Sequence, residues 1–220
     1  MAKPLSGRRA QAARNDEIIL RAARQVFGRD PGAPISTVAH RAGVGISALY
    51  RRYPSKDELL HQLSLDGLMR YNAILEAALD NPAAPWDVFT DFMENVVAAD
   101  THALVHLSVG FTQDEEIELA ARKSHLLSER LFERIKRANV LRVDITLEDW
   151  AVIHRQLSAI NFGDTPERTQ RLRRRYLALV LDAMRLPNAA PLPGPPPRFE
   201  ELNSHPDVQQ VNSPQLKAVC

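Results

Sequence analysis

Side chains that can bind an anion gather in one short stretch of the chain, residues 35–60. Hydroxyl, guanidinium and ammonium groups all donate hydrogen bonds, and the cationic groups also attract negative charge. The donors are Ser36, Thr37, Ser47, Tyr50, Arg51, Arg52 and Lys56. Small residues lie between them, and small residues permit close approach to a polyanion. The stretch is therefore the first candidate for a functional site.

Two short helical patterns position these donors, one on each side of residues 43–45. In the first pattern, residues 35–42, apolar side chains recur with the spacing of one helix face, and Gly43 can end the helix in a left-handed conformation. The second pattern, residues 46–52, stops before Pro54 and is so short that its neighbours must stabilise it. Two short helices joined by a tight glycine-containing turn are typical of a helix-turn-helix, whose second helix enters the DNA major groove.

The second short helix should turn Leu49 inward, with Tyr53 one turn later, and leave its polar edge outside. A solvated basic turn between core helices is the alternative, and an Arg-Arg pair alone would favour it. The tight turn and the start of the next helix, at Ser55–Glu58, favour the DNA-binding interpretation. Ser55 and Glu58 have the spacing of a capping box that opens a long helix. Lys56 lies in the first turn of that helix, where the dipole disfavours a cation unless an anion binds there.

Several residues of this stretch match a known sequence signature in residue type and in spacing. They are Val38, Ala39, Gly43, Val44, the run from Leu49 to Lys56, Leu59 and Leu60. On these residues, the segment 15–60 closely resembles the DNA-binding signature of the TetR family of bacterial repressors. Over the remaining chain only the number and order of helices agree with the family. The family usually has Ser or Thr at the position of Ala33-Pro34, so a phosphate-contacting hydroxyl would have to come from Ser36 or Thr37.

The residue pattern and the resemblance together predict a DNA interface along the exposed edges of both short helices. Its residues are Ser36, Thr37, Gly45, Ile46, Ser47, Ala48, Tyr50, Arg51, Arg52 and Lys56. The hydroxyl groups and Lys56 are expected to bind phosphates. Arg51, Arg52 and the edge Ile46–Ala48 are expected to face bases or the adjacent backbone, since arginine binds guanine O6 and N7 well.

The charge of the chain is divided unevenly along its length. The net charge of the 220 residues is +1, yet residues 1–60 hold 11 Lys and Arg against 5 Asp and Glu, and the remaining residues hold 17 against 22. A basic head on an acidic body indicates that only the head meets a polyanion. The length allows one large domain, or a small domain followed by a larger one with a core of its own.

Composition and motifs disfavour several other classes of protein. The single cysteine, Cys220, excludes a disulfide within the chain and disfavours a cysteine-based metal site. No apolar run approaches the roughly 18 residues that cross a bilayer, and the N-terminus has no apolar signal segment, so we expect a cytoplasmic protein. There is no Gly-rich phosphate loop and no Gly-x-Ser-x-Gly motif, so we expect no catalytic residue, no metal and no cofactor.

We predict an all-α protein with an N-terminal three-helix DNA-binding head and a C-terminal helical body, about nine helices in total. Beyond the two short helices, helical patterns cover about residues 15–27, 56–79, 87–99, 102–111, 114–138, the segment between Thr146 and Gly163, and the segment between Thr165 and Pro187. The expected domains are residues 1–14 (disordered basic arm), 15–60 (helix-turn-helix DNA-binding domain), 61–186 (helical ligand-binding and dimerisation domain) and 187–220 (Pro-rich disordered tail).

The body contains candidates for a ligand-binding site. Its large or polarisable side chains are Phe89, Phe92, Met93, His102, His106, Phe111, Phe132 and Trp150. Aromatic and methionine side chains at helical spacing are more often core than ligand-binding, so both interpretations stay open. His102 and His106 share one helix face with Asp100 nearby, a spacing that can bind a metal ion. A satisfied or solvent-exposed histidine is the simpler interpretation of each.

The resemblance implies a ligand-responsive transcriptional regulator that acts as a repressor. It would bind a palindromic operator as a homodimer through its last two helices, with Arg171 and Arg173–Arg175 on the rim of that interface. A small-molecule effector in the body would shift the helix at residues 56–79 and release the operator. Two alternatives remain: a metal-dependent sensor or enzyme that uses His102 and His106, and a non-specific architectural DNA binder.

Overall fold

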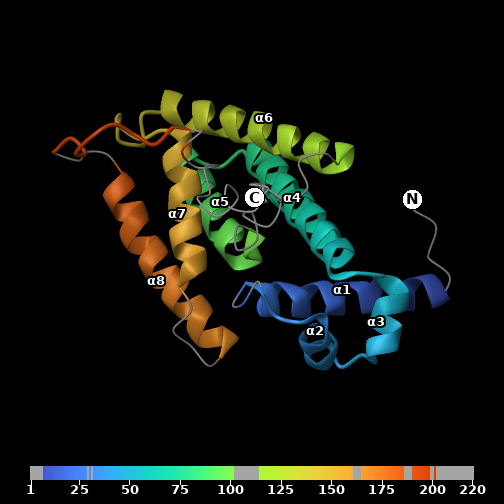
Figure 1. The fold of residues 1–220 in the computed structure, drawn as a ribbon. Coiled ribbons are helices and arrows are strands. Elements are labelled where there is room, and N and C mark those ends of the chain that lie inside the picture. Colours follow the sequence, from blue (N-terminus) through green and yellow to red (C-terminus); the bar gives the residue numbers. More distant parts are fainter. Residues whose placement is uncertain are drawn as a thin grey trace, which may run out of the picture.

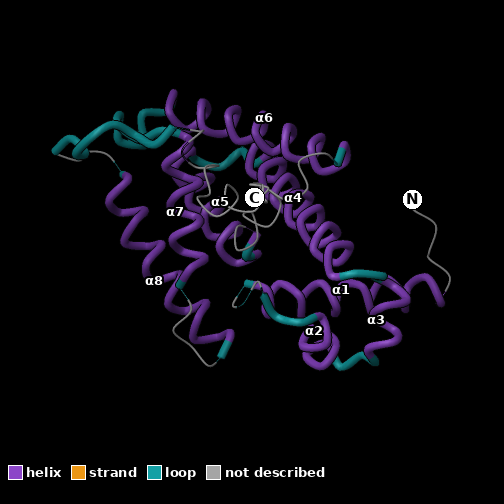
Figure 2. The backbone as a smooth tube through the Cα atoms, viewed as in Figure 1, coloured by secondary structure: helices purple, strands orange, loops and turns teal. Residues whose placement is uncertain are grey.

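Helices are the only regular elements of the computed structural model, which describes residues 7–28, 30, 32–101, 114–160, 165–185, 190–198 and 201 (Figures 1 and 2). They are α1 (Gly7–Phe27), α2 (Ile35–Ala42), α3 (Ile46–Arg52), α4 (Lys56–Asp80), α5 (Pro85–Ala99), α6 (Glu115–Arg137), α7 (Leu147–Ala159) and α8 (Pro166–Met184). The prediction of an all-α fold is confirmed. The helix predicted at residues 102–111 lies outside the described residues. None of the described helices is long and apolar enough to cross a membrane.

Helix α1 begins at Gly7, well before the predicted start at Asn15. The expected disordered arm at residues 1–14 is therefore wrong for residues 7–14. The sequence before Asn15 is rich in alanine, which has the highest helix propensity, so the helix continues through Asn15. Asn15 Oδ1 instead accepts a hydrogen bond from Gln11 Nε2 at 3.1 Å within the helix.

Three helix caps form as the local sequence requires. Ser55 Oγ accepts a hydrogen bond from the N–H of Glu58 at 3.0 Å at the start of α4. The carboxylate of Asp149 accepts one from the N–H of Thr146 at 2.8 Å at the start of α7. The Thr165 hydroxyl accepts a backbone N–H of the first turn of α8. These bonds satisfy N–H groups that have no partner within their helices.

Two hydrophobic clusters hold the described helices together. The first, the head cluster, joins α1, α2, α3 and the start of α4 and contains Phe27 and Leu49. The second, the body cluster, joins the rest of α4 to α5, α6, α7 and α8 and contains Phe89. Within the described residues α4 alone contributes to both, with Leu63 in the head cluster and Leu75 in the body cluster (Figure 1). A displacement of α4 in the body therefore reaches the head.

Charged side chains fix α1 on α4. Asp66 of α4 pairs with Arg24 of α1 and accepts a hydrogen bond from Arg70 Nε at 2.8 Å. The side chain of Arg24 is only 12% exposed, and its burial lowers its pKa. Because a partly buried ion pair leaves an uncompensated charge when one partner is removed, this contact ties the orientation of α1 to that of α4.

Arg173 turns inward from α8, so the rim position expected of it is wrong. Its guanidinium group donates to Asp100 Oδ1 at 2.7 Å and to the carbonyl oxygens of Ser158 and Ile160 at 2.5 and 3.2 Å. The carbonyl groups at the end of α7 have no partner within their helix, and a buried arginine satisfies them. Arg173 therefore joins α8 to the ends of α5 and α7.

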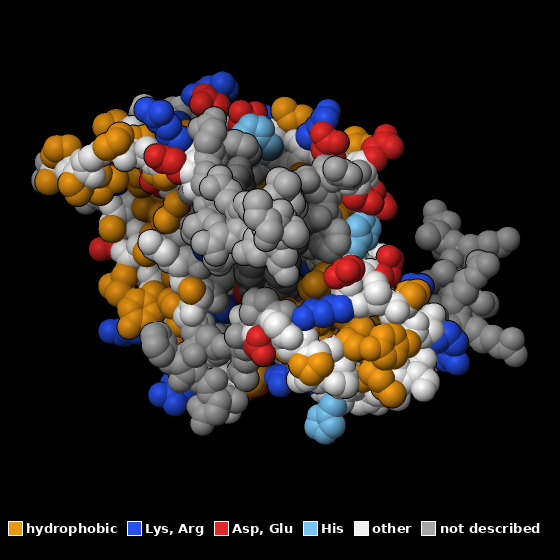
Figure 3. Space-filling view, in the orientation of Figure 1, with side chains coloured by type: hydrophobic (Ala, Val, Ile, Leu, Met, Phe, Trp, Pro, Cys, Tyr) orange, Lys and Arg blue, Asp and Glu red, His pale blue; other side chains and the backbone are white. Residues whose placement is uncertain are grey.

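The Pro-rich segment 190–198 has a fixed place on the body, so the predicted disordered tail is wrong for these residues. The N–H of Leu192 donates to Asp144 Oδ2 at 2.8 Å, and Arg142 Nη2 donates to the carbonyl oxygen of Ala190 at 2.7 Å. Arg142 and the N–H of Leu192 hold the pKa of Asp144 well below its usual range. A Pro-rich chain has no internal hydrogen bonds, so its backbone groups are available for these contacts. The segment projects at the upper left of Figures 1 and 3.

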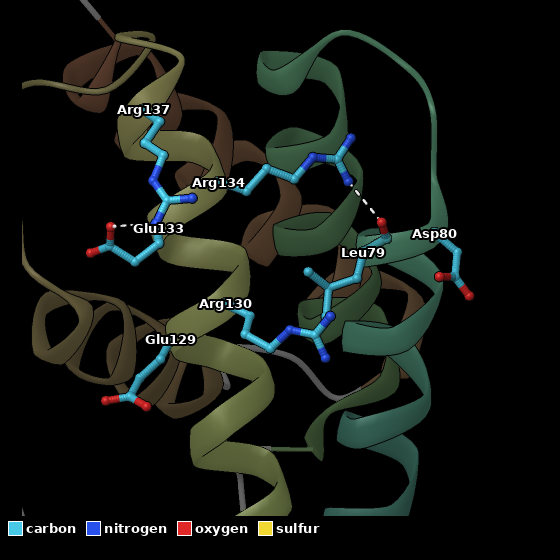
Figure 4. A pocket seen from close by; sticks show the side chains of 7 residues that line it. All are labelled: Leu79, Asp80, Glu129, Arg130, Glu133, Arg134 and Arg137. Carbon is cyan, nitrogen blue, oxygen red and sulfur yellow. Dashed lines mark hydrogen bonds and ion pairs between the residues drawn. The ribbon is translucent and has the colours of Figure 1, made fainter.

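A groove of about 460 Å³ lies between the ends of α4 and α6 (Figure 4). Its lining residues are Leu79, Asp80, Glu129, Arg130, Glu133, Arg134 and Arg137. Arg134 points across the groove and donates to the carbonyl oxygens of Ala78, Leu79 and Asn81, at 3.1, 2.9 and 2.7 Å. Because the last carbonyl groups of α4 lack partners within the helix, Arg134 acts as their cap.

Arg134→Ala should lower the free energy of unfolding by about 1.5–3 kcal/mol, because the end of α4 loses its charged donor. Urea denaturation followed by circular dichroism measures the change. The matched control is Arg130→Ala, which removes the same charge one turn earlier in α6, where the side chain is exposed. An equal loss of stability in both variants would contradict the capping role.

Candidate nucleic-acid interface

The turn between α2 and α3 has the geometry that its glycines predict. Gly43 has φ 67° and ψ 27°, the left-handed conformation that ends a helix. The N–H of Gly43 donates to the carbonyl oxygen of His40 at 3.2 Å, and the N–H of Val44 donates to that of Ala39 at 3.0 Å. These bonds end α2 and direct the chain into α3, so the predicted turn is confirmed.

Helix α3 is held from one side and exposed on the other. Leu49 is 0% exposed and Tyr53 is 3% exposed, and both belong to the head cluster. On the opposite edge Ile46 is 40% exposed and Tyr50 is 46% exposed, and Ser47 beside them is exposed as well. Hydrophobic side chains are visible over α2 and α3 in Figure 3, next to Lys and Arg side chains. Because Leu49 and Tyr53 are buried, the opposite edge of α3 is presented to the solvent.

The first turns of α2 and α3 contain backbone N–H groups without a side-chain cap. Pro34 precedes α2 and Gly45 precedes α3, and neither residue has a side-chain acceptor. Ser36, Thr37 and Ser47 in these two turns are exposed. Free N–H groups, hydroxyl groups and the positive end of the helix dipole together form an arrangement that suits an anion such as phosphate.

Lys56 does not point outward as expected for a phosphate contact. Its Nζ donates to the carbonyl oxygen of Ala33 at 2.9 Å and lies 5.1 Å from the centre of the Phe27 ring. The apolar stem of a lysine packs readily on a hydrophobic cluster, and the ammonium group then takes the nearest acceptor. In this structure Lys56 fixes the loop before α2.

Arg52 also differs from the expectation, because its outward charge is already paired. Arg52 Nε and Nη2 donate to the two carboxylate oxygens of Asp16, both at 2.7 Å. The hydrogen bond to Asp16 raises the pKa of Arg52, and the guanidinium carbon lies 5.6 Å from the centre of the Tyr53 ring. The pair joins α3 to α1. Asp16 lies far from Arg52 in sequence, so no local pattern indicates this contact.

Arg51 is the cation of α3 that remains available. Its side chain is exposed, and it takes part in no hydrogen bond or ion pair of the described residues. Tyr50 next to it is exposed, and Ala48 on the same edge adds no bulk. The predicted interface residues therefore fall into an exposed edge and two cations, Arg52 and Lys56, that are bound to other parts of the head.

Five of the predicted ligand-binding side chains meet in the body cluster, and we call these five residues the aromatic cluster. They are Phe89, Phe92, Met93, Phe132 and Trp150. The ring centre of Trp150 lies 5.0 Å from that of Phe89 and 5.1 Å from that of Phe132. Trp150 is 1% exposed, and its Nε1–H has no hydrogen-bond partner among the described residues. His154, which the sequence analysis did not select, lies beside them with Nε2 3.1 Å from Met93 Sδ.

The structure does not describe all of the candidate ligand-binding residues of the body. His102, His106 and Phe111 lie outside the described residues, so their roles stay predictions. Among the residues that the structure does describe, no three His, Cys, Asp or Glu side chains come together as a metal ion would require. A cleft of about 140 Å³ lies between the head and the α7–α8 pair, with Arg41 and Asp100 in its wall. Neither this cleft nor the groove of Figure 4 is lined by the aromatic cluster.

Comparison with known proteins yields a family model and a set of solved structures. Residues 19–63 match the model of bacterial regulatory proteins of the tetR family, and this segment contains α2 and α3. A TetR transcription regulatory protein from Mycobacterium vanbaalenii is 25% identical, with 81% of this chain and 99% of that chain covered and a TM-score of 0.51. No curated protein sequence matches the chain significantly.

Two further structures share the fold at lower identity. The TetR-like transcriptional regulator LfrR from Mycobacterium smegmatis, solved in complex with proflavine, is 20% identical over 76% of this chain and 96% of that chain, with a TM-score of 0.56. A ketosteroid transcriptional regulator from Mycobacterium tuberculosis is 15% identical over 84% of this chain and 98% of that chain, with a TM-score of 0.55. The likeness therefore extends from the head into the body.

Gly43→Ala should destabilise the head by about 1–2 kcal/mol, because an L-residue with a side chain is strained in the left-handed conformation. Gly45→Ala is the matched control: a Cβ at either position meets no atom within 4 Å, and Gly45 has φ −65°. Thermal unfolding of both variants measures the difference. Equal stability of the two variants would show that the turn tolerates a side chain at Gly43.

Proposed function

Given that the chain is a transcriptional regulator of the TetR family, we propose that it binds a palindromic DNA operator as a homodimer and that a small-molecule effector releases it. The observation that carries the proposal is the exposed edge of α3. Leu49 and Tyr53 fix this helix on the head cluster, and Ile46, Ser47 and Tyr50 stand outward. A short helix that is fixed by one buried face and exposed on the opposite face suits insertion into the major groove.

The outward residues divide into two kinds of DNA contact in this proposal. Arg51 is the candidate for reading base edges, since it is exposed and has no partner among the described residues. The hydroxyl groups of Ser36, Thr37, Ser47 and Tyr50 bind phosphates together with the free N–H groups of the helix starts. Gly45 and Ala48 keep the edge small enough for close approach. Arg52 and Lys56 act here as braces of the head.

The homodimer is proposed to form through α7 and α8. Tyr176 is 43% exposed and Leu179 is 58% exposed on α8, and side chains of this size are candidates for burial against a partner. A palindromic operator needs two recognition helices about 34 Å apart and related by a two-fold axis. A dimer built on the helices farthest from the head in sequence leaves both copies of α3 free.

The effector is proposed to bind at the aromatic cluster. Flat aromatic walls and the buried N–H of Trp150 offer stacking surfaces and one donor to an apolar or aromatic compound with an acceptor atom. LfrR, which shares this fold, was solved in complex with proflavine, and this supports a small-molecule site in a protein of this fold. Entry of a compound there displaces Phe89 or Met93, and α4 moves with them because it packs in the same cluster. The movement of α4 then reaches the head through the ion pair between Asp66 and Arg24.

Arg51→Ala should weaken binding to a duplex selected from a random pool by about 1–3 kcal/mol, roughly 5- to 150-fold, if Arg51 reads a base. Fluorescence anisotropy with the labelled duplex measures the change, and Arg130→Ala on the body is the control of equal charge. The unaltered protein should prefer the selected duplex to random DNA by at least ~10³-fold. A smaller preference would favour a non-specific architectural DNA binder.

Leu179→Glu should convert the dimer into monomers, because the interface would have to bury a carboxylate. Sedimentation velocity measures the mass. Leu126→Glu on α6 is the control, since Leu126 is 59% exposed and Leu179 is 58% exposed, and the dimer should persist in that variant. Dissociation of both variants, or of neither, would remove α8 from the proposed interface.

Compounds that release the operator should change the fluorescence of Trp150. The chain has 2 tryptophans, so Trp86→Phe leaves Trp150 as the single indole reporter. By linkage, a compound and the operator weaken each other's binding by the same factor, and both titrations should give that factor. A compound that releases the operator while the emission of Trp150 stays constant would place the effector site elsewhere.

A further inference from the structure

A bidentate ion pair joins α1 to α3 at the surface of the head. Asp16 of α1 accepts both hydrogen bonds from Arg52, each at 2.7 Å, in the parallel geometry that makes arginine–carboxylate pairs strong. The side chain of Arg52 is still 60% exposed, whereas that of Asp16 is 22% exposed. Arg52 is thus at the surface, but its Nε and Nη2 donors are occupied by Asp16.

Two other cations of the head, Arg41 and Lys56, donate to neutral acceptors. Arg41 Nε donates to Gln25 Oε1 at 2.6 Å, and Lys56 Nζ donates to the carbonyl oxygen of Ala33 at 2.9 Å. A phosphate competes easily with an amide for a cation, because the charge of the cation is not cancelled. Arg52 differs from these two, since Asp16 cancels its charge and also repels an approaching phosphate.

We propose that Asp16 is a positioning residue that holds Arg52 away from DNA phosphates and so limits the affinity of the head for DNA of any sequence. This inference rests on the proposed function, in which the edge of α3 binds DNA. Phosphate contacts supply nearly all of the affinity for random DNA, whereas base contacts distinguish the operator. A regulator that withholds one phosphate contact leaves random DNA faster and relies more on base contacts.

Asp16→Asn tests the proposal, because asparagine keeps the size of the side chain and removes its charge. A labelled random-sequence duplex is the probe, so no operator is needed. At low salt Asp16→Asn should bind this duplex about three- to tenfold more tightly, and the slope of log affinity against log salt should steepen by about 0.9, the value of one added phosphate contact.

Two further variants separate the release of Arg52 from the change of net charge. Glu17→Gln removes the same charge from the next position of α1, where Glu17 pairs with Arg21 at 3.0 Å rather than with α3. It should leave the slope unchanged. In the background of Arg52→Ala, Asp16→Asn should no longer steepen the slope, since the guanidinium group that gains the phosphate is absent.

The outcomes distinguish this inference from the function on which it rests. An unchanged slope in Asp16→Asn, or an equal increase in Glu17→Gln, overturns the role of Asp16 while duplex binding by the unaltered protein stands. A loss of thermal stability in Asp16→Asn with no gain in affinity assigns the pair a purely structural role and also overturns it. If neither the unaltered protein nor Asp16→Asn binds any duplex, the proposed function fails and the inference fails with it.

Discussion

The burial of Leu49 and Tyr53 in the head cluster is the interaction on which the DNA-facing surface depends. A helix as short as α3 is not stable by itself in water, so it keeps its shape only while these side chains hold it. The left-handed Gly43 directs the chain so that both side chains reach the cluster. The exposed edge with Tyr50 and Arg51 follows from that burial, because a helix that buries one face must present the other.

Helix α4 transmits the arrangement of the body to the head. It contributes to both hydrophobic clusters, and Asp66 near its middle holds Arg24 of α1. Arg173, which lines the same cleft as Arg24, joins α8 to the ends of α5 and α7. Tightly packed interiors move as units rather than deform continuously. Control of the head from the body therefore requires a displacement of α4, and this requirement is the physical basis of the proposed effector response.

The positive charge of the head acts at two different ranges. Net charge attracts DNA over long distances, so the excess of Lys and Arg in residues 1–60 favours association. Affinity at contact depends instead on donors that are free. Arg52 and Lys56 donate to Asp16 and to the carbonyl oxygen of Ala33, so part of this charge stabilises the head itself. The composition of the head thus indicates that it attracts a polyanion, but it does not indicate which side chains contact the polyanion.

Features that depend on neighbouring residues can be predicted from the amino-acid sequence alone: the all-α class, the turn at Gly43, the inward face of α3 and the helix caps. Each of these is set by residues within about one helical turn, so a local pattern is sufficient. The start of α1 was missed because a good cap at Asn15 competes with the alanine-rich sequence before it. The side-chain partners could not be predicted, because folding brings together residues that are distant in sequence: Arg52 and Asp16 lie 36 residues apart, and Arg173 and Asp100 lie 73 apart. A long cationic side chain takes whichever acceptor the folded chain brings within reach, and no spacing in the sequence encodes that choice.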